Sequence, residues 1–162
     1  MELKLKSISP DAIPAAIAKA EHYRNLNEPS EAESICRDIL VVDEKNQAAM
    51  RLFGLSLTDQ FTGHDTDPYN EAERIFAALE DAYERFYYTG LLRERRAKAE
   101  LRIGRASFMV TALLQDALKC FEEAEKLRPA GNDEAILRWN HCVRLVQSRP
   151  ELEWMARGTE SS

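Results

Sequence analysis

The sequence predicts an all-α protein, and three observations support this prediction. Apolar residues recur every three to four positions along most of the 162-residue chain, which is the spacing of one helix face. Glycine and proline are scarce, with six of each, whereas turn-rich all-β folds need more of both. Hydrophobic residues make up 44% and charged residues 31% of the chain, which is typical of a globular domain. A chain of this length predicts one domain, over residues 1–157.

The first half of the chain is expected to hold four helices separated by polar breaks. Asp11 can cap the first helix, and Pro14 suits a first helical turn because an N–H there would have no partner. Asn27, Glu28 and Pro29 interrupt the apolar periodicity before the second helix. The expected helices cover 13–26, 30–40, 47–61 and 69–87, with a polar loop over 62–68.

The second half is expected to continue with helices of the same kind. Gly90 is interpreted as a turn that separates the fourth helix from a fifth, which ends near Gly104. Pro150 is expected to end the last long helix, because proline cannot continue the hydrogen-bonded backbone. The remaining helices are expected at 112–127, 133–148 and 151–155, with 105–111 unassigned and a disordered tail at 158–162.

A repeat underlies these helices. The expected helices follow one another in pairs. Ala20 and Gly54 are small residues in the middle of the first helix of two successive pairs, and they lie 34 positions apart. Each second helix carries alanine, then a bulky residue four positions later, then an apolar residue seven positions later. The matching sets are Ala32, Cys36 and Ile39; Ala72, Phe76 and Leu79; and Ala117, Phe121 and Ala124. Small residues let two helix axes approach, so the pattern predicts closely packed helix pairs.

This helix–turn–helix period resembles the tetratricopeptide repeat (TPR) family. The resemblance implies a TPR-like helical-hairpin solenoid of about three helix pairs, with repeats at about 13–46, 47–88 and 89–131. A capping helix at about 133–148 closes it. Pro129 matches the proline that ends a family repeat. Ala97 and Gly104 match the small residues that the family has in the first helix of a repeat, here the third repeat. Insertions of six residues in the second repeat and eight in the third depart from the family pattern.

The resemblance implies a function in protein–protein recognition, because the first helices of such repeats line a concave groove. The chain is expected to be a non-catalytic adaptor or scaffold that binds a peptide segment or a partner protein there. Two alternatives stay open: a small dedicated chaperone for a disordered client, and a structural subunit of a homodimer. The partner-binding residues that the family register implies are Ile17, Glu21, Arg24, Arg51, Leu55, Lys98 and Arg102.

The residues that enzymes and metal centres need are sparse. His22, His64 and His141 are the only histidines, and their spacing matches no zinc motif. His64 precedes Asp65 and Asp67 in a loop, but the pattern is not that of a calcium-binding loop, and loop aspartates usually cap turns. The glycines are isolated, so the sequence shows no phosphate-binding loop. We therefore expect no catalysis, no cofactor and no metal site.

Charge and cysteine content bear on partners and compartment. The net charge of −6 argues against nucleic acid and anionic membranes as partners, because both attract a positive field. The sequence contains no signal-like or membrane-spanning apolar stretch. The three cysteines are odd in number and far apart, which is typical of unpaired core residues. The expected location is the cytoplasm, and the choice between monomer and homodimer stays open.

One segment reverses the acidic balance of the chain. Seven basic and two acidic residues lie between Arg85 and Arg105. Four of the basic residues step by three and four positions and so share one helix face, which we name the basic stripe. The basic stripe consists of Arg95, Lys98, Arg102 and Arg105. It either neutralises Glu80, Asp81 and Glu84 on the preceding helix or forms a recognition surface for an acidic partner.

Aromatic residues crowd the same region of the sequence. They are Tyr83, Phe86, Tyr87 and Tyr88. Two interpretations are open: these rings fill the core of an enlarged helical hairpin, or they form a partly exposed anchor for an interface.

Overall fold

The computed structural model describes residues 1–105 and 107–152, and within these ranges it contains helices and no strand. The all-α prediction is therefore confirmed for the described part of the chain. The helices are α1 (Ile13–Asn25), α2 (Pro29–Val42), α3 (Gln47–Asp59), α4 (Tyr69–Ala77), α5 (Ala82–Arg102), α6 (Ser107–Leu127) and α7 (Glu134–Gln147). Short 3-10 turns, η1 (Pro10–Ala12) and η2 (Pro150–Leu152), flank them.

Most helix boundaries agree with the sequence to within a few residues. The polar loop over 62–68 and the turn before α7 are also found where they were expected. Asp11 lies in η1, and the residue before the first turn of α1 is Ala12, so the expected cap is wrong. The expected helix at 151–155 is replaced by η2 as far as Leu152, and its remainder lies outside the described residues, as does the expected tail at 158–162.

The prediction of one long helix over 69–87 followed by a turn at Gly90 is wrong. The chain breaks earlier, because α4 ends at Ala77 and α5 begins at Ala82. Asp81 caps α5 by accepting a hydrogen bond from the Glu84 N–H at 3.2 Å. The helix then runs through Gly90, so the repeat boundary expected at 88/89 falls inside α5.

Gly90 serves close packing and not a turn. A Cβ at this position would lie 2.7 Å from the ring of Phe121 on α6. A Cβ at Gly54 on α3 would likewise lie too close to the ring of Phe76 on α4. Both rings are fully buried. The close contact of α5 with α6 is therefore made at Gly90, and Ala97, the small residue expected there, is also buried.

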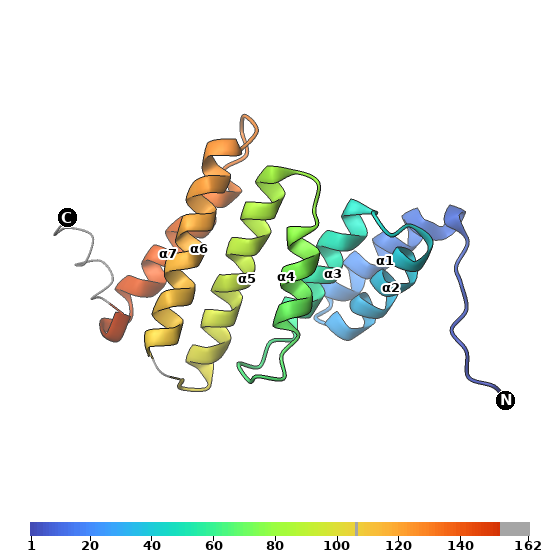
Figure 1. Cartoon of the computed structure of the whole chain (residues 1–162), viewed down its shortest axis with the longest axis horizontal. Coiled ribbons are helices and arrows are strands. Elements are labelled where there is room, and N and C mark those ends of the chain that lie inside the picture. Colours follow the sequence, from blue (N-terminus) through green and yellow to red (C-terminus); the bar gives the residue numbers. More distant parts are fainter. Residues whose placement is uncertain (106, 153–162) are drawn as a thin grey trace.

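Each helix packs against the next one in the chain, and α1, α3, α5 and α7 also contact one another in that order. We call these four the odd helices. Figure 1 shows the helices side by side, from α1 at one end of the molecule to α7 at the other. In the described part of the chain, no helix is both long enough and apolar enough to cross a membrane.

The aromatic residues near the start of α5 mostly belong to the core. Tyr88 stacks on Phe76 with ring centroids 5.3 Å apart, and Tyr83 stacks on Tyr87 at 5.8 Å. Tyr83 is buried, Tyr87 and Tyr88 are half-buried, and Phe86 is exposed. The core interpretation thus holds for three of the four rings. Together they join α4, α5 and α6.

Candidate interaction surface

One carboxylate links three of the odd helices. Asp59 lies at the end of α3, and its two oxygens accept hydrogen bonds from two arginines. Arg24 of α1 approaches with Nε at 2.6 Å from Oδ2, and Arg95 of α5 with Nη1 at 2.7 Å from Oδ1. Arg95 also donates to the Thr58 hydroxyl at 2.7 Å. Asp59 thereby fixes α1 and α5 on either side of α3.

A second carboxylate links α5 to α7. Glu94 is fully buried, and Arg138 of α7 donates to its Oε2 from both Nε and Nη2. The Cys142 thiol donates to Oε1 at 3.5 Å, and His141 Nε2 lies 3.7 Å from the same oxygen. A buried carboxylate is costly unless it is paired, so these contacts hold α7 in place. Burial raises the pKa of the Cys142 thiol, and the charge of Glu94 adds to the effect.

A third pair, nearer the start of α5, adds a second link between α3 and α5. Arg51 of α3 donates to Glu84 of α5 at 3.1 Å. We name the full set the charge row: Arg24, Arg51, Asp59, Glu84, Glu94, Arg95 and Arg138. Apart from Glu94, their side chains are between 21% and 30% exposed. They are therefore held in fixed positions and remain in reach of a partner.

Arg95 lies among charges of both signs in the charge row, those of Asp59, Glu94, Arg24 and Arg138. Burial lowers the pKa of its guanidinium, and the charge of Asp59 opposes this effect. The positive charges of Arg24 and Arg138 lower the pKa further. An additional carboxylate brought near Arg95 would relieve this repulsion.

The charged residues expected to bind a partner lie on α1, α3 and α5, each with its own contacts. Arg24 and Arg51 belong to the charge row. Lys98 lies one turn beyond Arg95, with Nζ 3.4 Å from His141 Nε2. Arg102 lies near the end of α5 and donates to the Phe61 carbonyl at 3.2 Å.

The other expected residues have different surroundings. Glu21 is exposed on α1, one turn before Arg24. Ile17 and Leu55 are half-buried and pack against the core. They support the helices of the charge row more than they present a surface.

Two arginines of the basic stripe pair with carboxylates, but not with the acidic residues expected from the sequence. Arg95 binds Asp59, and Arg105 approaches Asp65 at 3.3 Å. Glu84 precedes Arg95 by eleven residues, which places the two about 16 Å apart along the axis of α5. Glu84 therefore cannot pair with Arg95, and it binds Arg51 of α3. Asp81 caps α5, and the backbone carbonyl of Glu80 accepts from Arg85.

The loop that contains His64 is organised by Asp67. This carboxylate accepts hydrogen bonds from the Thr62 N–H at 2.8 Å, the Thr62 hydroxyl at 2.7 Å, the Gly63 N–H at 2.7 Å and Arg96 at 2.9 Å. Burial alone would raise the pKa of Asp67, but these bonds and the Arg96 charge outweigh it and hold the pKa below its ordinary value. Within the described residues, no group of three or more His, Cys, Asp or Glu side chains is placed to hold a metal ion.

Sequence reasoning missed the contribution of α7, which was interpreted only as a cap. Arg138 and His141 are three positions apart and so share a helix face, which is the signal that was available.

No protein-family model, curated protein or solved structure matches the chain. The candidate surface therefore rests on its own geometry.

Proposed function

We propose that this chain is a non-catalytic protein–protein interaction module of the cytoplasm, an adaptor or scaffold with a TPR-like arrangement of helix pairs. Its odd helices bind an acidic segment of a partner protein. The observation that carries this proposal is the charge row, whose ion pairs join α1 to α3, α3 to α5 and α5 to α7.

The packing of the helices supports a solenoid of repeats. Small residues and bulky rings meet in the same way in two successive pairs, Gly54 with Phe76 and Gly90 with Phe121. Contacts between α1, α3, α5 and α7 are what a stack of helix pairs needs, because each pair rests on the next. Such a stack offers one extended, rigid surface for a linear partner segment.

The charge balance supports an acidic partner. The charge row together with Glu21, Lys98 and Arg102 holds six basic and four acidic residues, and one of the four, Glu94, is fully buried. This surface is positive although the whole chain has a net charge of −6. Opposite charge across an interface gives specificity and speeds association.

Affinity capture from the native cell lysate, followed by mass spectrometry, tests the proposal. The wild type is compared with a double reversal, Lys98→Glu with Arg102→Glu, and with a milder pair, Lys98→Gln with Arg102→Gln. Lys119→Glu with Lys126→Glu on α6 is the matched control, because both lysines are exposed and the charge change is the same. Circular dichroism and melting temperature establish that each variant folds.

We expect a partner that the wild type and the α6 control retain and that the reversal loses. The Gln pair should weaken capture less, and added salt should weaken wild-type capture, because the Debye length falls from about 10 Å at 0.1 M to about 3 Å at 1 M. Equal capture by the wild type and a folded double reversal, at low and high salt, would refute the proposal.

A further inference from the structure

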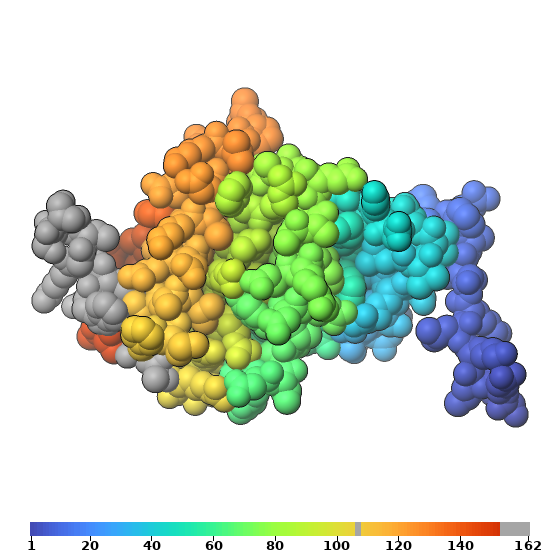
Figure 2. All heavy atoms as spheres, viewed as in Figure 1, coloured from blue at the N-terminus to red at the C-terminus, as the bar shows by residue number. Residues whose placement is uncertain are grey.

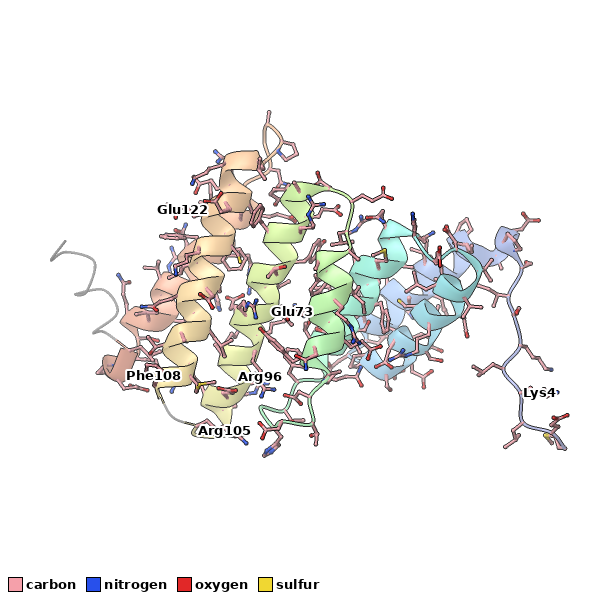
Figure 3. The ribbon with its side chains drawn as sticks, in the orientation of Figure 1. Lys4, Glu73, Arg96, Arg105, Phe108 and Glu122 are labelled. Carbon is pink, nitrogen blue, oxygen red and sulfur yellow. The ribbon has the colours of Figure 1, made fainter. Side chains whose placement is uncertain are left out.

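A hollow opens between α4 and α6 because α4 is much shorter than its neighbours. α4 has 9 residues, whereas α5 and α6 have 21 each, so α4 covers only part of α5. The hollow measures about 370 Å³ and is lined by the loop before α4, the start of α4, α5 and α6. Figure 3 shows this side of the molecule, with Arg96, Arg105 and Phe108 at its lower edge.

The two walls of the hollow differ in chemistry. One wall is acidic and carries Asp65, Asp67 and Glu71 from the loop and α4. The opposite wall is apolar and carries Met109 and Leu113 from α6. Met109 is itself exposed, so this apolar wall is open to solvent.

The floor of the hollow contains an acceptor without a donor. Glu100 of α5 has a side chain that is 7% exposed, and its Oε1 accepts from Arg96 Nε at 3.0 Å. Its other oxygen, Oε2, is buried and has no hydrogen-bond partner among the described residues. A buried acceptor in this state is unfavourable, so a cationic donor that reached it would be stabilising.

The Asp65 carboxylate, at the rim of the hollow, can accept further hydrogen bonds. Its carboxylate is 87% exposed, and Arg96 and Arg105 approach only one of its oxygens, at 3.9 Å and 3.3 Å. Asp67 is already bonded to the loop and to Arg96, and Glu71 pairs with Arg37. Asp65 and Glu100 are therefore the carboxylates that a cationic ligand would meet.

The chain carries a segment with complementary chemistry. Residues 1–9 form no helix or strand, and Figure 2 shows them leading away from the helices as a narrow arm. Leu3 and Leu5 are 89% and 96% exposed. When such a segment is extended, Leu3 and Leu5 lie along one edge, and Lys4 and Lys6 lie along the other with Glu2, which pairs with Lys4 at 3.1 Å. Apolar side chains exposed together indicate a surface that another molecule covers.

We propose that residues 1–9 of one copy bind in the hollow of a second copy. Leu3 and Leu5 pack on Met109 and Leu113, while the two lysines face the acidic wall. The segment comes from a second copy because it lies beside α1 and α2, at the end of the molecule away from α6 (Figure 1). This surface is separate from the charge row, and the inference does not rest on the proposed function.

Sedimentation velocity over a range of concentrations, with a charge swap between the two surfaces, tests this inference on the full chain. The segment variant is Lys4→Glu with Lys6→Glu, and the hollow variant is Asp65→Lys with Asn70→Lys. Asn70 is exposed and lines the hollow, so its replacement breaks no core contact. The control for the segment variant is again Lys119→Glu with Lys126→Glu on α6.

We expect the wild type and the control to associate as concentration rises. Each charge variant alone should need at least about tenfold more protein to associate, since both of its contacts become repulsive. An equimolar mixture of the two variants should regain association, because each segment then meets a hollow of opposite charge.

Three results would overturn the inference. A wild type that stays monomeric throughout the range shows that no second copy binds, and this includes the case in which the segment folds back on its own chain. A segment variant that associates like the wild type shows that Lys4 and Lys6 are not involved. Two folded variants that stay monomeric when mixed show that the segment does not meet this hollow.

Discussion

Arg24 of α1 and Arg95 of α5 bind the same carboxylate, that of Asp59 on α3: Arg24 donates to both oxygens, and Arg95 donates to Oδ1. The two arginines belong to helices that are not neighbours in the chain, and a single side chain holds both. The geometry is fixed at both contacts, at 2.6 Å and 2.7 Å. Asp59 is therefore the residue on which the alignment of α1, α3 and α5 depends most.

Replacement of Asp59 by alanine should lower stability. The change leaves two partly buried guanidinium groups beside each other without their shared carboxylate, and we expect a loss of about 2 kcal/mol in the free energy of unfolding. Urea unfolding at pH 7 measures it. Asp65→Ala is the control, because this exposed loop residue should cost less than about 1 kcal/mol. Equal losses for the two variants would contradict the central role of Asp59.

Gly90→Ala should destabilise the protein although alanine favours helices. The added Cβ would meet the Phe121 ring at 2.7 Å, and such overpacking costs about 1–3 kcal/mol. Thr89→Ala, one residue earlier in α5, is the matched control and should have a much smaller effect. Thermal unfolding measures both variants. If Gly90 marked a turn, or if α5 and α6 were farther apart, Gly90→Ala would be neutral or stabilising.

The Asp67 carboxylate should make stability depend on pH in the acid range. Its pKa in the folded protein lies below its ordinary value near 3.8, so its contribution is complete above that value and is lost as pH falls towards the folded pKa. At pH 7 we expect Asp67→Asn to cost about 2 kcal/mol, because the amide cannot accept all the bonds from Thr62, Gly63 and Arg96. Urea unfolding at pH 7 and pH 3 measures the difference in free energy of unfolding between the wild type and the variant, which should be smaller at pH 3. A larger difference at pH 3 would contradict this role of Asp67.

The cysteines should differ in reactivity towards a thiol reagent. Burial raises the pKa of Cys36 to about 12, with a further contribution from Glu33, and burial likewise raises the pKa of Cys142. Burial also raises the pKa of Cys120, but this thiol is only half-buried and the charge of Arg93 opposes the effect. Thiolate is the reacting form, so in the native protein at pH 8 Cys120 should react faster than Cys36 and Cys142. Cys120→Ser should then remove the fastest native reaction, while all three thiols of the wild type react in denaturant. Rapid native labelling of Cys36 would show that the α2 core is open.

The helices were predictable from the sequence where a break carries glycine, proline or a run of polar residues, as at 43–46 between α2 and α3. The link between α4 and α5 carries none of these, and apolar periodicity continues across it, so one long helix was expected. Asp81, followed three positions later by Glu84, was the available signal for a helix start. Gly90 was misread because glycine serves both turns and close packing, and only the position of Phe121 decides between them.

The candidate surface was predictable only in part. The repeat register led to Arg24 and Arg51, because a periodic pattern tells which residues share a helix face. The pairing of Arg95 with Asp59 joins residues on separate helices, and no local pattern encodes it. The same holds for Glu94 of α5, whose buried carboxylate pairs with Arg138 of α7.

The most direct test of the central claim is to map the bound partner segment on the protein by backbone amide NMR. The acidic segment of the captured partner is added to the labelled full chain, and shifts are followed residue by residue. The account predicts that the largest changes fall on α1, α3, α5 and α7, close to Arg51, Arg95, Lys98 and Arg138. Changes confined to α2, α4 and α6, or to the hollow beside Asp65, would contradict it.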